Sequence, residues 1–448
     1  MTTTTEPKAS SAGAPPDEAW RTTDADLPFR VTSGVWRPEI VEKIEKTIAR
    51  LDAELRELSL DLHAHPELSF KEHHAHDVLT KFMEKEGFEV ERQFHLPTAW
   101  RATFSHTGPN STSKASRTIG VNSEMDALPG VGHACGHNLI AIAGVAVAIA
   151  VKEALVEFGM DGKVSLLGTP AEEGGSGKVI LLDKGAYKDM AACLMCHPAP
   201  GPQGSASLSS CLAINGKKVN FKGHSAHAGL SPWEGVNALD AAVLAYNNVS
   251  VLRQQVKPTH RIHGIFHGNE WAANIIPDNS EMTWLVRAPT RAEANALTKR
   301  VEPCFHAAAL ATGCEVDVEE VTRSMYDLRQ NKALGDELST LYQCRYGSVN
   351  HGWGISSAST DFGNVSYELP SLHPSFAIPT VPNGGNHTHE FASAAKTPEA
   401  HRATLNMCKA LAAVGVRVIE DDEFFAQVKE TFEEDKKKRE DEFEKAGL

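Results

Sequence analysis

Several features that would place this chain in other functional classes are missing from its sequence. The longest apolar run, LIAIAGVAVAIAV at residues 139–151, has 13 residues, whereas a membrane-spanning helix needs about 20. The N-terminal segment has no apolar core of the kind that a secretory signal carries, so we expect no such signal. The formal net charge of −14 is the opposite of the basic balance that nucleic acid or an anionic membrane attracts. We therefore expect neither as a partner.

Cysteine is also scarce for so long a chain. Eight cysteines in 448 residues do not make the dense framework of a small disulfide-stabilised protein. Together with the missing signal, this predicts a reduced, cytoplasmic protein. Hydrophobic residues make up 41% and charged residues 23% of the chain, which is an ordinary globular composition. The length exceeds what one simple core accommodates, so two domains are expected.

The residue pattern predicts a two-domain α/β protein whose main domain is interrupted by a smaller one. Residues 1–36 are rich in Thr, Ser, Ala and Pro, and we expect a flexible tail there. Residues 37–210 alternate helical and strand patterns, as in the first part of a catalytic α/β sheet domain. Residues 211–322 follow a β-α-β-β-α-β order, which is typical of a ferredoxin-like module. Residues 323–448 return to the main domain and end in a charged, solvated helix.

The densest group of candidate functional residues follows the predicted strand TIGVNSEM. Asp126 lies just past this strand, and His133, Cys135 and His137 follow at every second position. A loop at the carboxyl end of a strand, with a buried helix behind it, is where an open α/β sheet places its active site. Imidazole and thiolate groups both suit zinc or a similar ion. A single histidine is more often structural, but this cluster makes metal binding a serious alternative.

Two further predicted strands also end in candidate groups. TPAEEGGSGK brings the adjacent Glu172 and Glu173 into a glycine-rich turn. Neighbouring side chains point in different directions, so one carboxylate can bind a metal while the other faces the substrate as a general base. A plain surface loop is the alternative. His197 ends the apolar strand AACLM, and Cys193 and Cys196 form a CxxC there, to which we give little weight because no second CxxC exists.

Histidine pairs in two other loops complete the set of candidates. His224 and His227, in GHSAHAG, lie in the inserted module and matter only if that module folds over the site. His387 and His389 lie in the glycine-rich segment GGNHTHEF. Each motif alone is a weak signal. Together, four strand-end or loop motifs that supply His, Cys or Glu point to a dinuclear metal hydrolase.

These motifs resemble the co-catalytic metallopeptidase family that includes aminoacylase, carboxypeptidase G, carnosine dipeptidases and aminobenzoyl-glutamate hydrolase. The resemblance covers about residues 40 to 420 and rests on EMDALPG, GHACGHN, TPAEEGG, CHPAP, GHSAHAG, ANIIPD, STDFGNVS and GGNHTHEF. GHACGHN and STDFGNVS are most similar to the branch of aminobenzoyl-glutamate hydrolase and β-alanyl-lysine (Xaa-Arg) dipeptidase. The family implies a catalytic α/β domain of the phosphorylase/hydrolase-like type, interrupted by a lid through which two copies form a homodimer.

The resemblance also implies a metal centre with two divalent ions, zinc by default and manganese as the alternative in this branch. The ligands that it implies are Cys135, His137, Glu173, His197 and His387. His389 lies close enough to His387 to remain an alternative. Glu172 would be the general base, and Asp126 would either orient a ligand histidine or tune the site from outside the set of metal ligands.

The resemblance also implies roles for two residues of the lid, and the chain departs from the family pattern at two other positions. His227 matches a histidine that reaches the substrate, often across the dimer, and Asn274 matches a substrate-binding asparagine. Many relatives carry a histidine ligand where this chain has Glu124, so that ligand is absent or replaced here. Many also carry aspartate where this chain has Asn138. Both departures leave the identity and occupancy of the metals open.

The leading interpretation is hydrolysis of an amide bond in a dipeptide or N-acyl amino acid by metal-activated water. The net acidity and the branch both favour a basic leaving group, while aminobenzoyl-glutamate and other aromatic N-acyl substrates stay open. One alternative is the same site run in the amide-forming direction. Another is a non-catalytic binding relative, against which the complete ligand set argues.

Overall fold

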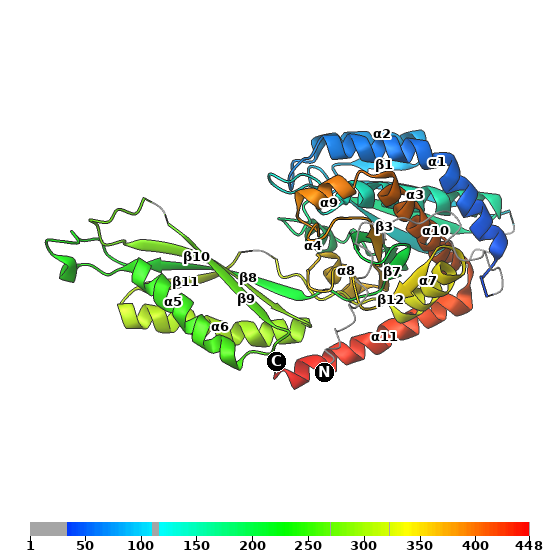
Figure 1. The fold of residues 1–448 in the computed structure, drawn as a ribbon. Helices are drawn as coiled ribbons and strands as arrows, with labels where there is room; N and C mark the ends of the chain where they lie inside the picture. The colour runs from blue at the N-terminus through cyan, green and yellow to red at the C-terminus, as the bar shows by residue number, and fades with distance from the viewer. Residues whose placement is uncertain (1–33, 110–115, 269, 322, 448) are drawn as a thin grey trace, which may run out of the picture.

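The computed structural model describes residues 34–109, 116–268, 270–321 and 323–447. Most of the expected N-terminal tail therefore lies outside the described residues. Figure 1 shows a larger α/β domain and a smaller, elongated domain that extends away from it and is called the lid below. This arrangement confirms the predicted two-domain α/β class.

A six-stranded sheet forms the centre of the main domain. Its strands are β1 (Glu89–Arg92), β2 (Trp100–His106), β3 (Thr118–Glu124), β4 (Gly162–Thr169), β5 (Ala192–Leu194) and β13 (Ser371–Leu372). They lie in the order β1-β2-β4-β3-β5-β13, and β3 runs parallel to both of its neighbours. β3 is buried over nearly its whole length, as expected for the central strand of a parallel sheet. Its carboxyl end therefore delivers the loop that follows it into the interior of the domain.

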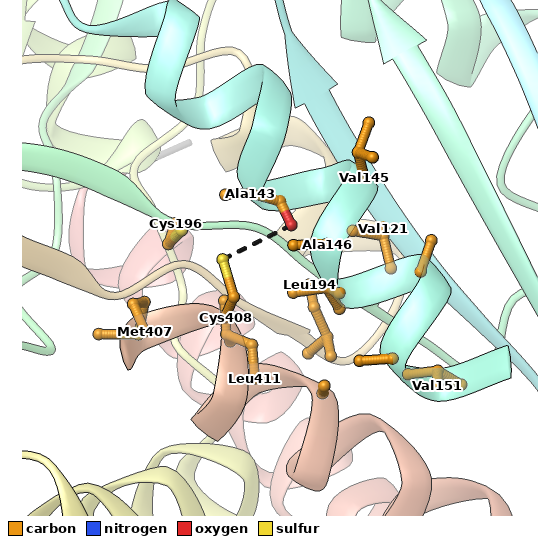
Figure 2. Packing of buried hydrophobic residues seen from close by; sticks show 14 of the residues in the cluster. Val121, Ala143, Val145, Ala146, Val151, Leu194, Cys196, Met407, Cys408 and Leu411 are labelled. Atoms are coloured by element: carbon orange, nitrogen blue, oxygen red, sulfur yellow. Dashed lines mark hydrogen bonds between the residues drawn. The ribbon is translucent and has the colours of Figure 1, made fainter. Parts of the chain in front are cut away.

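Helix α3 (His137–Glu157) lies against β3 and is buried along most of its length. It is the one helix in the described residues that is long and apolar enough to cross a membrane, but 83% of that stretch is buried inside the protein, as in a core helix. Gly144 lets α3 approach β3 closely, because a Cβ there would lie 2.8 Å from the Asn122 carbonyl oxygen. Figure 2 shows α3 packed against Cys408 of helix α10 (Pro398–Glu420), and the Cys408 Sγ lies 3.8 Å from the Ala143 carbonyl oxygen.

Further helices enclose this core. They are α1 (Pro38–Ala64), α2 (His73–Lys85), α4 (Gly177–Asp183), α7 (Lys332–Arg345), α8 (Phe362–Glu368), α9 (His389–Ala394), α10 (Pro398–Glu420) and α11 (Asp422–Lys445). The start of α10 follows from its sequence, because the Thr397 hydroxyl accepts a hydrogen bond from the Ala400 N–H and proline occupies the first turn. The predicted charged helix is α11, whose few buried residues include Phe424 and Val428.

A second, four-stranded sheet in the main domain was not predicted. Its strands are β6 (His197–Pro200), β7 (Ser205–Ser207), β12 (Ser348–Asn350) and β14 (Ser375–Ile378). Their order is β12-β7-β14-β6. His197, which we expected to end a strand, instead begins β6. Strands of three or four residues are too short for a recognisable periodicity, so the sequence pattern did not show this sheet.

The lid has the predicted ferredoxin-like β-α-β-β-α-β order. Its elements are β8 (Ala213–Lys222), α5 (Ala238–Leu252), β9 (Arg261–His267), β10 (Asn279–Ala288), α6 (Arg291–Thr312) and β11 (Glu315–Glu320). The antiparallel strands lie in the order β11-β8-β10-β9. Both helices pack around a core that includes Trp284 and Phe305. The chain re-enters the main domain at Met325, which pairs with Ile214 at the root of β8.

Candidate metal centre

The loop between β3 and α3 carries two of the candidate ligands into the interior. Cys135 and His137 are both buried, and His137 is the first residue of α3. Gly136 between them adopts a left-handed conformation with φ 82°, and a Cβ there would lie 2.5 Å from Pro198. Only glycine fits this position without strain. The glycine therefore allows Cys135 and His137 to lie against the segment that carries His197.

The predicted ligands come together in two groups that share one sulfur atom. Cys135, His137 and His197 form one group, and the Cys135 Sγ lies 3.3 Å from His197 Nε2. Cys135, Glu173 and His387 form the other, and His387 Nε2 lies 3.4 Å from Glu173 Oε1. The ligand atoms within each group lie within 4.8 Å of one another. Two adjacent positions with mixed S, N and O donors and a shared thiolate suit a pair of divalent transition ions.

The backbone at this centre is held in uncommon conformations. His387 has φ 71°, and its N–H donates to the Ala134 carbonyl at 2.8 Å, which ties the C-terminal ligand loop to the loop of Cys135. Ala171 and Ser176, on either side of the glutamate pair, have φ 58° and 53°. Such left-handed geometry is costly for residues other than glycine and gathers at functional sites. His389 belongs to none of the ligand groups among the described residues, so His387 is the histidine that the structure places in the cluster.

Asp126 connects the glutamate pair to a ligand histidine. Its Oδ1 lies 3.2 Å from His137 Nδ1 and accepts the Glu172 N–H at 3.2 Å, while its Oδ2 accepts the Glu173 N–H at 3.0 Å. A carboxylate on one ring nitrogen fixes the tautomer and leaves the other nitrogen free for a metal. Asp126 therefore contacts the His137 ring and the backbone of both glutamates, and is placed to orient them together.

Glu172 lies beside the ligand set, inside the protein. It is only 7% exposed and belongs to a group with His137 and Glu173. Burial raises the pKa of its carboxyl well above the usual range, and the nearby carboxylates of Glu124 and Glu173 raise it further. A buried carboxyl group that retains a proton more readily than usual can act as a proton carrier near neutral pH.

The donor atoms are suited to cations. Burial raises the pKa of the Cys135 thiol well above its ordinary value, and Glu173 adds to this effect. A coordinated metal is what makes such a thiol ionise. Burial lowers the pKa of His197 to about 4, so its imidazole is neutral and available as a ligand at neutral pH. Within the described part of the chain, the buried atoms His137 Nε2 and Glu173 Oε1 make no hydrogen bond of good geometry, although both face the centre.

Three charged residues at the centre were missed by the sequence analysis. The Lys178 ammonium is fully buried and pairs with Glu124 Oε1 at 2.7 Å and with Asp361 Oδ1 at 2.6 Å. Both carboxylates are buried as well. Lys178 and Asp361 belong to the quoted motifs TPAEEGGSGK and STDFGNVS, but nothing in a single sequence shows that they meet. Glu124, which was noted only as the residue where relatives have a histidine, lies 3.3 Å from His137 Nε2.

The remaining histidine and cysteine candidates lie outside the ligand groups of the described residues. His133 is buried, and burial lowers its pKa to about 3. Its ring lies 6.1 Å from that of His63. Cys193 lies within β5, where its thiol is 3.8 Å from Asn122 Oδ1. His224 pairs through its backbone with Val236 in the lid. The structural interpretation therefore suits each of them.

His227 and Asn274 lie together in the lid but not at the candidate metal ligands of their own chain. The Ala228 N–H donates to the Asn274 carbonyl at 3.0 Å, and His227 pairs with Ile275. The loop of His227 follows the outer end of the ten-residue strand β8, whose inner end adjoins the main domain. Ten residues at about 3.3 Å each separate the two ends by roughly 30 Å. Figure 1 shows this outer end of the lid pointing away from the main domain.

A further residue that sequence analysis missed is Arg287 on β10. Its guanidinium is half-buried and donates to the Ser359 hydroxyl at 2.8 Å. The hydrogen bond with Glu173 raises the pKa of His387, and the positive charge of Arg287 opposes that rise. Burial lowers the pKa of Arg287 itself. Within the described part of the chain, no carboxylate forms an ion pair with it. A partly desolvated guanidinium without an acidic partner is a candidate site for an anionic group of a ligand.

Comparison with known proteins agrees with this geometry. The model of Peptidase family M20/M25/M40 matches residues 120–410. Xaa-Arg dipeptidase from Homo sapiens is 42% identical over 407 residues, covering 87% of this chain and 90% of the relative. One of the chains of p-aminobenzoyl-glutamate hydrolase from Escherichia coli is 28% identical and covers 80% of this chain and 87% of its own length.

Solved structures share the fold. A dinuclear metal binding peptidase of the M20 family from Bacillus subtilis superposes with a TM-score of 0.60 at 19% identity, over 83% of this chain and 99% of its own. An aminobenzoyl-glutamate utilization protein from Klebsiella pneumoniae gives a TM-score of 0.65 at 16% identity, over 84% and 99% of the two chains. With the family match and the identity to the dipeptidase, these findings show that the chain belongs to Peptidase family M20/M25/M40.

Proposed function

We propose that this chain hydrolyses dipeptides that end in a basic residue, at the centre formed by Cys135, His137, Glu173, His197 and His387. The reaction class, metal-dependent cleavage of an amide in a dipeptide or N-acyl amino acid, follows from its family. The observation that carries the proposal is the pair of ligand groups sharing Cys135, with the buried Glu172 beside them. The substrate class is supported by the 42% identity to a protein named Xaa-Arg dipeptidase.

Each residue of the centre has a separate role in the proposed reaction. Two divalent ions, when bound, would supply an acidified water and an electrophile for the amide carbonyl. Glu172 takes the proton from the attacking water and later delivers it to the departing amine, because its carboxyl is buried beside the ligand groups. Asp126 fixes the positions of Glu172 and His137 relative to each other through the hydrogen bonds that it accepts from both residues. Zinc is the default metal for these donors, and manganese is the second candidate.

His227 is proposed to stabilise the oxyanion in the active site of a partner chain. Its Nδ1 accepts the N–H groups of Gly229 at 3.2 Å and Leu230 at 3.0 Å, so the neutral ring carries its proton on Nε2. That N–H is a suitable donor for a developing negative charge. His227 lies beyond the outer end of β8, away from the candidate ligands of its own chain. A homodimer through the lid would bring it to the second copy's centre.

Arg287 is proposed to bind the C-terminal carboxylate of the substrate. Its unpaired guanidinium lies on the lid strand that enters the main domain, and its charge acts on the pKa of His387. Arg287→Ala should lower kcat/KM for free dipeptides roughly 10- to 100-fold, as expected for a lost charge-assisted contact. The same variant should cleave a dipeptide with an amidated C-terminus at the wild-type rate. An equal loss for both substrates would refute this role.

The experiment that tests the function is amide hydrolysis across a mixed panel by protein reconstituted with zinc or with manganese. The panel holds β-alanyl-lysine, dipeptides ending in arginine or ornithine, aminobenzoyl-glutamate and several N-acyl amino acids, each with and without a chelator. We expect chelator-sensitive cleavage of the dipeptides with basic C-termini. Preferential cleavage of aminobenzoyl-glutamate would refute the substrate class, and cleavage that survives the chelator would refute the metal centre.

Mixing two inactive variants tests the dimer separately. In a dimer of Glu172→Gln with His227→Ala, one site has both an intact Glu172 and an intact His227 from the partner chain. Full exchange of chains should restore about a quarter of the wild-type activity, because half of the dimers are mixed and each has one competent site. If both groups acted within one chain, mixing would restore nothing.

A further inference from the structure

Glu124 lies at the end of β3 and faces the metal centre. Its carboxylate is fully buried, and its Oε2 is 3.3 Å from His137 Nε2. Neither of these two atoms makes a hydrogen bond of good geometry within the described part of the chain. Buried polar atoms without partners are rare and call for an explanation, such as an ion between them.

The spacing of these two atoms suits a shared cation. His137 Nδ1 faces the Asp126 carboxylate at 3.2 Å, so a ring that binds a metal through Nε2 keeps its proton on Nδ1. Nε2 and Glu124 Oε2 would then both present lone pairs to that cation. Ligand atoms about 2.0–2.1 Å from a tetrahedral zinc ion lie roughly 3.3 Å from one another. The observed separation of 3.3 Å matches that spacing.

Lys178 fixes which oxygen of Glu124 is available. Its ammonium pairs with Oε1 at 2.7 Å and leaves Oε2 directed at His137. Asp361 holds the lysine in place, because its carboxylate accepts the Lys178 backbone N–H at 2.9 Å and the ammonium at 2.6 Å. The ammonium thus compensates the charge of the buried Glu124 carboxylate and leaves Glu124 Oε2 free for a cation.

We propose that Glu124 is a metal ligand, through Oε2, on the ion that His137 Nε2 binds. The inference rests on the metal centre of the proposed function and adds a sixth ligand to it. Glu124 then occupies the ligand position that was expected to be absent or replaced. The competing explanation is that Glu124 serves only as the counter-ion of Lys178.

Metal titration of two matched variants separates these explanations. Glu124→Gln and Asp361→Asn each remove one buried carboxylate from Lys178, but only Glu124 contacts His137. Zinc stoichiometry by elemental analysis and affinity by chelator competition would be measured on the full chain. We expect Glu124→Gln to lower the affinity for one of the two ions. The loss should exceed the roughly 10- to 100-fold that is typical when a residue supporting a ligand is removed. Asp361→Asn should stay within that range.

Failure of the proposed function and failure of the Glu124 role give different results in these measurements. A wild-type chain that binds neither zinc nor manganese would refute the proposed function itself. Two ions bound by Glu124→Gln with wild-type affinity, or equal weakening in both variants, would refute the role of Glu124 alone. If Glu124→Gln does not fold by near-ultraviolet circular dichroism, Glu124→Asp replaces it, because its shorter carboxylate keeps the charge beside Lys178 and draws back from His137. Cobalt absorption should then change in that variant, and an unchanged spectrum would refute the role.

Discussion

The Asp126→Asn substitution tests how far one buried carboxylate organises the centre. Asp126 accepts from His137 Nδ1 and the Glu172 N–H on Oδ1, and from the Glu173 N–H and the Ser69 hydroxyl on Oδ2. Asparagine offers one acceptor oxygen in place of two. If that oxygen replaces Oδ1, the amide NH₂ faces the Glu173 N–H. The hydroxyl of Ser69 can reverse and accept, but the backbone N–H of Glu173 cannot.

The expected cost follows from this count. At least one part-buried N–H loses its acceptor, which costs about 1–3 kcal/mol of unfolding free energy. The neutral amide also orients His137 less strongly than a carboxylate, which should weaken metal binding roughly 10- to 100-fold. Urea unfolding of the metal-free protein measures the first effect, and zinc competition against a chelator measures the second.

Ser69→Ala is the matched control for Asp126→Asn. It removes only the 3.3 Å hydrogen bond between the Ser69 hydroxyl and Asp126 Oδ2. Its cost should stay below about 1 kcal/mol, and zinc affinity should be unchanged. If Asp126→Asn bound zinc as tightly as the wild-type chain, the orienting role of Asp126 would be wrong. If Ser69→Ala had the same effect as Asp126→Asn, the loss would reflect general disturbance of the loop.

Three further substitutions address the base, the buried lysine and a buried histidine. Glu172→Gln should lower kcat roughly 10²–10⁴-fold with unchanged metal content by elemental analysis; loss of metal would make Glu172 a ligand. Lys178→Met leaves Glu124 and Asp361 buried without a counter-ion and should cost about 3–5 kcal/mol in urea unfolding; a cost near zero would contradict the ion pairs. Burial lowers the pKa of His373 to about 3, so the folded state binds fewer protons than the unfolded state below pH 6.5. Its contribution is lost as pH falls from 6.5 toward 3, by about 1.4 kcal/mol per pH unit, and His373→Phe should reduce the slope of unfolding free energy against pH in metal-free protein.

The long elements of the fold were predictable because their residue patterns are local. The apolar strand before Asp126 and the apolar run behind His137 are β3 and α3. Alternation of apolar and polar residues over ten positions indicated β8. The order of the lid elements followed from the strand and helix patterns of the segments after it. The strand-end rule for α/β sheets then grouped Asp126, Glu172 and Glu173 from the sequence alone.

Residues whose meaning depends on distant partners were not predictable. Lys178 follows a glycine-rich turn, where a lysine is ordinarily a surface residue, and its partners lie 54 positions before it and 183 positions after it in the sequence. Arg287 lies in an alternating strand at a position that suits an exposed side chain. Its half-buried state depends on the root of the lid meeting the Ser359 loop. Pairing across such separations is a property of the fold rather than of any local pattern.

The charges of the centre argue for two ions rather than one. Five carboxylates and the thiol of Cys135 belong to this centre, where the Lys178 ammonium pairs with two of the carboxylates. The carboxylates belong to Glu124, Asp126, Glu172, Glu173 and Asp361. With every acid ionised, five negative charges remain uncompensated, a state that a buried site does not sustain. One divalent ion would leave three of these charges, and two would leave one. The one negative charge that remains with two ions corresponds to the one ionised carboxylate that the proposed role of Glu172 as general base requires.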